Sequence, residues 1–256
     1  MGLKRLTLKI GGRAFENGTG LAELGLELAG LEDRQIILVH GGGAEISRAL
    51  QRSGHATRFI DGVRVTSADE IEIVERVLSH DINTRIAETL QAAGVRCRRM
   101  SGRTQRLFRI EPLMRKGQDL GRVGRIVSVN PEPLFSALDA GEIPVVSPIS
   151  EDDSGLCYNV NADSAAAAVA AGASCTDLVY YTDVPGVQIG GETLLSLTES
   201  KARALVSECA ITGGMIAKLE SSFEALHRGV ARVHITSWQG GKSFAAQLQG
   251  GTVVHH

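Results

Sequence analysis

Five short clusters rich in glycine or polar residues, each placed against an apolar segment, constrain the fold of this chain most strongly. Four of them come directly after short apolar runs, as expected where a strand ends in a turn: KIGG at 9–12, HGGG at 40–43, NVNAD at 159–163 and TDVPG at 182–186. The fifth, TGGMIAK at 212–218, opens a helical pattern. Glycine makes up about 12% of the chain, 30 residues of 256, against a typical ~7%, which indicates tight turns and close approach of the backbone to a ligand.

Apolar runs of strand length alternate with helical patterns along the chain. Strands are predicted over 6–10, 35–39, 95–100, 143–148, 178–182 and 232–235, and helices over 21–31, 44–52, 130–140, 163–171, 200–208 and 215–227. Several strands are continuously apolar, which is typical of a mostly parallel sheet covered on both faces by helices. We therefore predict an α/β fold: a three-layer αβα sandwich with a central, mostly parallel sheet. The length permits one large domain or two closely joined lobes.

Two segments carry local signals of another kind. Thr66 to Asp69 fits a capping box for a helix that runs to about residue 93. Residues 103–125 hold seven basic residues against only Glu111 and Asp119, and three glycines interrupt them. This basic segment is predicted to be a β-hairpin or loop, either simply solvated or used as a docking surface for an acidic partner.

Composition excludes several functional classes. A net charge of −2 argues against a nucleic-acid binder, and no apolar run reaches the 18 residues of a membrane span. Four scattered cysteines without a CxxC pair argue against a zinc site or a disulfide framework, and the start of the chain lacks the apolar region of a signal peptide, so a cytoplasmic location is expected. The Walker A, protein-kinase and GxGxxG motifs are missing.

The clusters suit phosphoryl transfer. The carboxyl ends of parallel strands meet at one sheet edge, so the clusters can share a cleft. Backbone N–H groups at glycine turns and helix N-termini can hold phosphoryl oxygens, and fixed cations neutralise the charge that develops there. Lys9 and Lys218 lie beside such turns, and the carboxylate of Asp163 could hold both. His40 is expected to be a packed, hydrogen-bonded residue rather than a general base.

The ordered set LKIGG, LVHGGG, GVRVT, NVNAD, TDVPG and ITGGMIAK resembles the amino acid kinase superfamily, and within it the acetylglutamate kinases. The resemblance covers about residues 4–254. Each motif is weak by itself, whereas the set in this order and spacing is highly specific.

The resemblance implies a role for each matching residue. Lys9 and Lys218 are the expected transition-state lysines and Asp163 their organiser. The expected substrate-binding residues are Gly42, Gly43, Arg64, Asn159 and Asn161. The expected nucleotide-binding residues are Gly11, Gly12, Thr182, Asp183, Val184, Gly186, Gly213, Gly214 and Met215. No metal-binding protein residue is expected, because Mg²⁺ would be carried by the ATP phosphates.

The activity implied is ATP-dependent phosphorylation of the side-chain carboxylate of N-acetyl-L-glutamate. The implied layout is one domain over 1–256, with an acyl-amino-acid lobe over about 1–172 and an ATP lobe over about 173–256. The alternative acceptor is glutamate or aminoadipate attached to a small acidic carrier protein, because Ser101-Gly102 is followed by Arg103 to Arg106 where acetylglutamate kinases commonly have a different pattern. A homodimer is expected, since an N-terminal helix that joins dimers into hexamers in arginine-inhibited members has no counterpart before residue 4.

Overall fold

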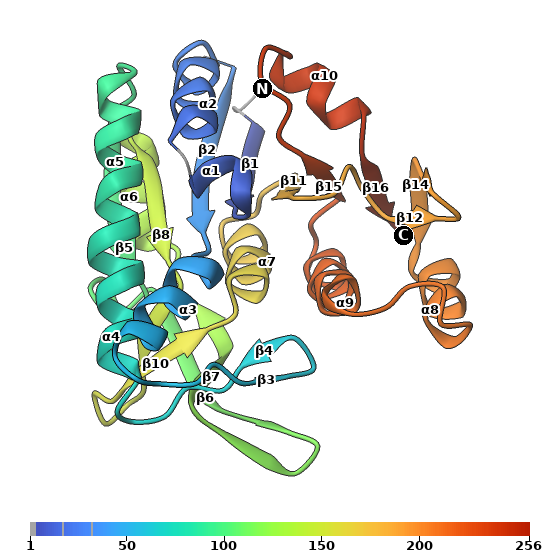
Figure 1. Cartoon of the computed structure of the whole chain (residues 1–256). Helices are drawn as coiled ribbons and strands as arrows, with labels where there is room; N and C mark the ends of the chain where they lie inside the picture. The colour runs from blue at the N-terminus through green and yellow to red at the C-terminus, as the bar shows by residue number, and fades with distance from the viewer. Residues whose placement is uncertain (1–3, 17, 32) are drawn as a thin grey trace.

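An eight-stranded, mostly parallel sheet forms the centre of the molecule (Figure 1). The computed structural model describes residues 4–16, 18–31 and 33–256. Only the β15–β16 pair of this sheet is antiparallel. The strand order across the sheet is β14 (Ser196–Thr198), β16 (Thr252–His255), β15 (Arg232–Ser237), β11 (Asp177–Thr182), β1 (Lys4–Ile10), β2 (Arg34–His40), β8 (Ile143–Ser147) and β5 (Cys97–Ser101). The prediction of a mostly parallel α/β fold is confirmed.

Helices cover both faces because successive strand side chains point to opposite sides of the sheet. Ile37 and Val39 of β2 face a core shared with α6 (Glu132–Asp139), α7 (Ala162–Gly172), α8 (Glu199–Ser207) and α9 (Gly214–His227). Ile36 and Leu38 face the opposite core, shared with α2 (Thr19–Ala29), α3 (Gly43–Arg52), α5 (Asn83–Ala92) and α10 (Phe244–Gln249). Full burial of each such aliphatic side chain contributes about 1.5–3 kcal/mol. The three layers of the predicted sandwich are present.

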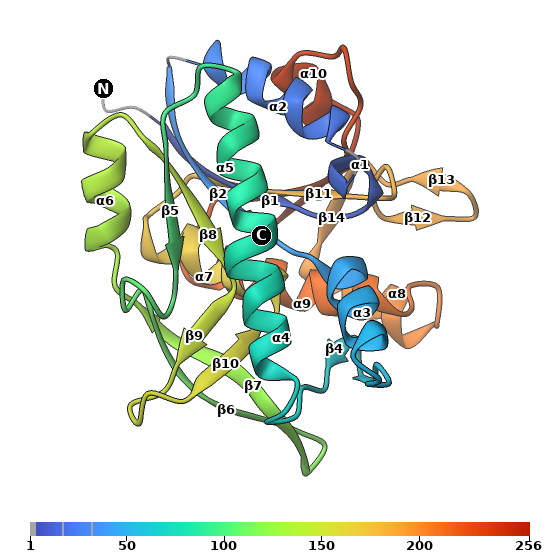
Figure 2. The same cartoon turned by 60° about the vertical axis from the view of Figure 1, so that its left-hand side comes forward.

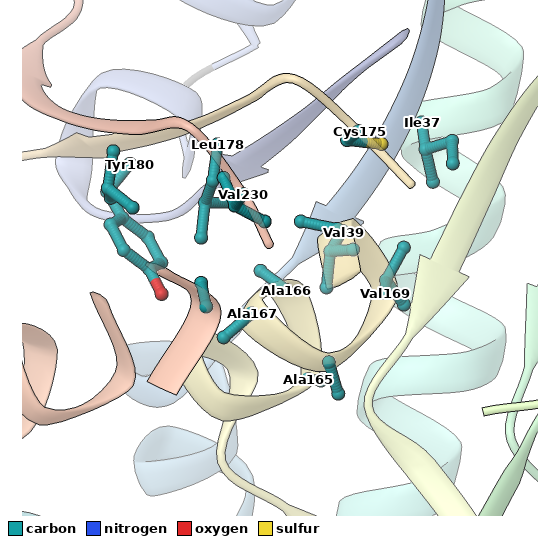
Figure 3. Close-up of a cluster of buried hydrophobic side chains, with 14 of the residues drawn as sticks. Ile37, Val39, Ala165, Ala166, Ala167, Val169, Cys175, Leu178, Tyr180 and Val230 are labelled. Carbon is teal, nitrogen blue, oxygen red and sulfur yellow. The ribbon is translucent and has the colours of Figure 1, made fainter. Parts of the chain in front are cut away.

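Helix α7 lies close to the sheet because its buried face consists of small side chains. Ala165 to Ala168 are all buried, and Figure 3 shows Ala166 and Ala167 between Val39 of β2 and Tyr180 of β11. This close packing brings the N-terminal end of α7, and with it Asp163, to the carboxyl ends of β1 and β11.

A second, four-stranded sheet carries the basic segment. Its order is β6 (Phe108–Arg115), β7 (Gln118–Val129), β10 (Cys157–Val160) and β9 (Ile149–Glu151). The segment was predicted to be a β-hairpin or a loop, and it forms the antiparallel β6–β7 hairpin. Several of its cations pair with acids of the same chain: Arg103 with Glu75 and Glu151, Lys116 with Asp61, Arg125 with Glu111, and Arg115 with Glu220.

The helix predicted after the capping box is present and ends at Ala92, close to the predicted end, but the acid that caps it differs from the prediction. The acid of the box is Glu70, not Asp69, because the Glu70 carboxylate accepts the N–H of Ser67 at 2.8 Å. The helix then comprises α4 (Ile71–Glu75), a π-helical stretch (Arg76–Ile82) and α5, and Figure 2 shows it running along the sheet face. Single π-helical turns within α-helices are frequent at functional sites.

Small elements that the sequence analysis did not predict complete the fold. They are α1 (Arg13–Glu16), the hairpin of β3 (Phe59–Ile60) and β4 (Val63–Arg64), and the hairpin of β12 (Gln188–Ile189) and β13 (Glu192–Thr193). Strands β9, β14 and β16 and helix α10 were not predicted either. Among the described helices, none has the length and apolar character needed to cross a bilayer.

Candidate active site

The glycine clusters converge at one edge of the sheet. In the parallel register, Ile10 lies opposite His40 and Lys9 opposite Tyr180, so β1, β2 and β11 end together. A cavity of about 210 Å³ opens at this edge. Nine predicted site residues line it: Lys9, Gly11, Gly12, Gly42, Gly43, Arg64, Asn159, Asn161 and Asp163. Residues as far apart in the chain as Lys9 and Asp163 therefore share one cavity.

Asp163 joins the two predicted lysines. Lys9 Nζ lies 2.8 Å from Asp163 Oδ1, and Lys218 Nζ donates a hydrogen bond to Asp163 Oδ2 at 2.7 Å. All three side chains are largely buried. Burial by itself would raise the pKa of Asp163, but the charges of the two lysines outweigh it and hold that pKa well below its ordinary value. The carboxylate is therefore ionised throughout the physiological range.

Lys218 is the more confined of the two cations. Its ammonium lies 4.6 Å from the ring centroid of Tyr180, and its side chain is 9% exposed. Burial lowers the pKa of Lys218, and the charge of Lys9 adds to this, whereas Asp163 opposes it. An anionic ligand in the cleft would relieve the mutual repulsion of the two lysines, which favours binding of a highly charged group there.

The N-terminus of α7 is capped by Asn161, not by Asp163. The side-chain oxygen of Asn161 accepts the N–H groups of Asp163 at 2.9 Å and Ser164 at 3.0 Å. Asp163 itself therefore does not cap the helix. Capping by Asn161 leaves both carboxylate oxygens of Asp163 free to face the lysines, and the Asn161 amide nitrogen free to face the cavity.

Arg64 lines the same cavity and is held by several contacts. It is 6% exposed, and its Nη2 donates to the carbonyl of Gly43 at 2.8 Å and to Ser47 Oγ at 3.0 Å. Its guanidinium also lies 4.8 Å from the ring centroid of Phe59. Its Nε has no acceptor among the described residues. Asn159 lies near it on β10, donating to Thr66 Oγ1 at 3.5 Å.

The remaining predicted residues lie on the C-terminal side of the cleft. Gly213 has φ 62° and precedes α9, and a Cβ added to Gly213 or Gly214 would meet no atom within 4 Å, so this helix N-terminus is open. The Asp183 carboxylate accepts the N–H of Arg13 at 2.8 Å and lines a second cavity of about 340 Å³ together with Gly11 and Gly12. Gly186 is buried beside Thr193 and Thr252. Thr182, Val184 and Met215 flank this side without lining either cavity.

Residues 4–237 match the sequence model of the amino acid kinase family. The chain belongs to the amino acid kinase family. It is 39% identical over 234 residues to the acetylglutamate kinase of Chloroflexus aurantiacus, a match that covers 91% of this chain and 92% of that one. It is 37% identical over 250 residues to the acetylglutamate kinase of Methanocaldococcus jannaschii, covering 91% and 82%. The resemblance inferred from the motifs is confirmed.

A solved member of the same fold agrees with this assignment. The crystal structure of smu.665 from Streptococcus mutans UA159 has a TM-score of 0.83 with this chain at 26% identity, and the match covers 98% of each chain. The three-layer architecture is thus shared over the whole length of this amino acid kinase.

Several residues around the cleft of this amino acid kinase escaped the sequence analysis. Phe59, Ser47 and Thr57 surround Arg64, and Tyr180 lies beneath Lys218. The β3–β4 hairpin has a sequence signal, because Asp61 and Gly62 adopt φ values of 47° and 78°, and Asp-Gly is typical of a tight hairpin turn. Tyr180 has no such signal, since an aromatic residue in a buried strand is ordinary core.

His40 is buried and hydrogen-bonded, as expected, and it is neutral at neutral pH in the folded protein. Burial lowers its pKa from the ordinary 6.5 to about 4, and the hydrogen bond to Gly41 offsets this only in part. Between these two pH values the unfolded chain binds more protons than the folded one, so stability rises with pH. The contribution is complete above pH 6.5 and is lost as pH falls toward 4.

We expect this histidine to account for on the order of 3 kcal/mol of acid destabilisation. Urea unfolding of the wild type and of His40→Asn, measured at intervals between neutral pH and the onset of acid unfolding, checks it. The wild type should show the steeper dependence, whereas parallel curves would mean that His40 is not held neutral.

Proposed function

We propose that this protein transfers the γ-phosphoryl group of ATP to the side-chain carboxylate of N-acetyl-L-glutamate. The observation that carries the proposal is the Lys9–Asp163–Lys218 arrangement at a cavity that Arg64 also lines. The acetylglutamate kinases that match over nine-tenths of this chain support the choice of acceptor.

The reaction requires charge stabilisation more than covalent assistance. A carboxylate oxygen of the acceptor forms a bond to the γ-phosphorus, while the bond to the bridging β–γ oxygen breaks and ADP leaves. In the proposed mechanism, Lys9 neutralises charge from the acceptor side and Lys218 from the nucleotide side. Asp163 keeps both ammonium groups in position, so little reorganisation is needed when charge develops.

The acceptor would occupy the 210 Å³ cavity, within the lobe of residues about 1–172. The buried guanidinium of Arg64 would bind the carboxylate that does not react, and the amides of Asn159 and Asn161 would bind the acetylamido group. Gly42 and Gly43 would direct backbone N–H groups at the reacting carboxylate and the γ-phosphoryl group.

ATP would enter with Mg²⁺ on its phosphates and bind mainly to the lobe of residues about 173–256. The open N-terminus of α9 at Gly213 and Gly214 can accept phosphate oxygens, because its N–H groups and the helix dipole both favour negative charge. The loop from Thr182 to Gly186 follows β11 at the same sheet edge and would complete the nucleotide site.

Arg64→Lys is expected to raise KM for N-acetyl-L-glutamate with a smaller effect on KM for ATP. Lysine keeps the charge but loses the planar fork and the bonds to Gly43 and Ser47. Loss of charged hydrogen bonds worth about 1.5–3 kcal/mol corresponds to about a 10- to 100-fold rise. Initial-rate measurements with each substrate varied separately test this, and an unchanged KM would remove Arg64 from the substrate site.

Trapping the product decides the proposed function. An acyl phosphate reacts with hydroxylamine to give a hydroxamate, so the protein is incubated with MgATP, hydroxylamine and N-acetyl-L-glutamate. We expect ATP-dependent hydroxamate from the wild type and almost none from Lys218→Ala. Free glutamate and free aspartate serve as acceptor controls. A wild type no better than Lys218→Ala would refute the proposal.

The alternative acceptor, a glutamate or aminoadipate carried by an acidic protein, has weaker support. Four of the seven cations in the basic segment pair with acids of this chain, although Arg106 and Arg109 line an exposed hollow with Asp152 and Asp153. If electrostatic attraction to the basic segment binds an acidic carrier, this binding would weaken strongly as the salt concentration rises from about 50 to about 300 mM. Activity on the free acceptor that is indifferent to salt in this range favours N-acetyl-L-glutamate.

A further inference from the structure

Arg99 on β5 fixes the orientation of a buried amide behind the glycine loop. Its Nε donates to Asn83 Oδ1 at 2.9 Å, and its Nη2 donates to the carbonyl of Ser79 at 2.7 Å. Since a guanidinium only donates, the atom of Asn83 that faces Nε must be the oxygen. The amide nitrogen of Asn83 therefore points the other way, toward β2 and β8.

The amide nitrogen of Asn83 in turn selects the tautomer of His40. Asn83 Nδ2 lies 3.0 Å from His40 Nε2 and 3.0 Å from the carbonyl of Val145. Because Nδ2 carries only protons, Nε2 has to accept and so bears none. Both side chains are buried, at 1% exposure for His40 and 2% for Asn83, so water cannot substitute for either bond.

The remaining ring proton of His40 sets a peptide plane of the glycine loop. With Nε2 bare, the neutral ring carries its proton on Nδ1, which lies 3.0 Å from the carbonyl oxygen of Gly41. In a trans peptide the C=O and the N–H point in opposite directions. The N–H of Gly42 is thus turned away from His40, and no described residue accepts it.

The π-helical stretch holds the same peptide from the other side. A Cβ on Gly42 would lie 2.3 Å from Ile82 Cδ1 and 3.0 Å from Leu78 Cδ2, so these side chains pack directly on the backbone of Gly42. Asn83 follows Ile82 in the chain, and Ser79, whose carbonyl Arg99 binds, lies in the same π-helical turn. One turn therefore supplies both the packing and the hydrogen-bond anchor.

We propose that Arg99, Asn83 and His40 form a positioning relay that aims the Gly42 N–H at the transferred phosphoryl group. The relay touches no substrate and acts only through the Gly41–Gly42 peptide. It rests on the proposed phosphoryl transfer, and it assigns His40 a donor role through Nδ1 rather than a role in proton transfer.

Two replacements of His40 separate the two links of the relay. The amide nitrogen of His40→Asn can take the place of Nδ1 and keep the bond to Gly41. His40→Gln reaches the position of Nε2 and keeps the bond from Asn83, but it leaves the Gly41 carbonyl without its donor. We expect His40→Asn to retain most of kcat. His40→Gln should lose about 10- to 100-fold, somewhat less than deletion of an oxyanion donor, with both KM values nearly unchanged.

A matched control separates positioning from stability. His234 is another buried histidine of the same sheet, 8% exposed and 3.1 Å from Asp177, at the edge remote from the cleft. His234→Gln should lower the thermal midpoint without lowering kcat. Equal kcat values for His40→Asn and His40→Gln, with both proteins folded, would overturn the relay.

Histidine-selective ¹⁵N NMR of the ligand-free protein reads the tautomer directly. The resonance pair that disappears in His40→Asn belongs to His40, and it should show a protonated Nδ1 and a bare Nε2. A proton on Nε2 would contradict the relay. Since this measurement needs no turnover, an inactive wild type would defeat the proposed kinase function while the relay would still be tested.

Discussion

Lys9→Met is expected to lower kcat for hydroxamate formation by on the order of 10²–10³-fold, the effect of removing one fixed donor from a developing negative charge. Methionine has a similar length and apolar stem, so packing around β1 should persist. The ammonium lies 2.8 Å from Asp163 and would be 3.0 Å from a Cβ on Gly11, so it lies against the glycine turn at the end of β1. KM for ATP should change much less than kcat.

Steady-state rates with both substrates varied test this expectation. Lys201→Met, a change of the same chemistry at an exposed position of α8, serves as the control and should behave as the wild type. If Lys9→Met kept wild-type kcat, the ion pair with Asp163 would be structural, and the charge assigned to the acceptor side would have to come from elsewhere.

Asp163→Asn is the second change with a large expected effect, and it should act on stability and on catalysis together. Removing the carboxylate leaves two largely buried ammonium groups without their shared counter-charge. Breaking a buried ion pair from one side typically destabilises by about 3–5 kcal/mol. The value of kcat should fall by at least about 10²-fold, which is the effect of losing a single fixed donor, because both lysines lose their orientation.

Asp177→Asn is the matched control for this experiment. Asp177 is also a buried carboxylate at the end of a central strand, paired with Arg232 at 2.8 Å and His234 at 3.1 Å, but at the opposite edge of the sheet. It should lower the free energy of unfolding and leave kcat unchanged. Denaturant unfolding and kinetics of both variants, compared side by side, separate the two roles. Asp163→Asn with wild-type kcat would show that Asp163 does not organise the lysines.

The frame of this fold could be predicted from local sequence. Buried strands such as 35–39 are continuous apolar runs that end in glycine, and the parallel arrangement then brings Lys9, the HGGG loop and Asp163 to one edge. The cluster of nine predicted residues around one cavity followed from that topology. The β6–β7 hairpin was likewise indicated by glycines within a charged stretch.

The parts that escaped prediction depend on contacts between distant residues. Glu70 and Asp69 are both acids at a helix start, and only the geometry shows that Glu70 reaches back to Ser67. Asn161 and Asp163 are both residue types that cap helix N-termini well. In the structure Asn161 is the cap, and the Asp163 carboxylate forms ion pairs with two lysines instead. The π-helical turn at Arg76–Ile82 has no local signal in the sequence, and its Leu78 and Ile82 pack on Gly42, which lies far away in the chain.

Binding of a transition-state mimic tests the central claim, that Lys9 and Lys218 stabilise the transferred phosphoryl group rather than the ground state. Calorimetry with MgADP, aluminium fluoride and N-acetyl-L-glutamate should show tight binding to the wild type, because the metal fluoride mimics the phosphoryl group in the transition state. We expect Lys9→Met to bind MgADP as the wild type does and to lose the added affinity for the mimic. Mimic binding by Lys9→Met as tight as that of the wild type would contradict the account.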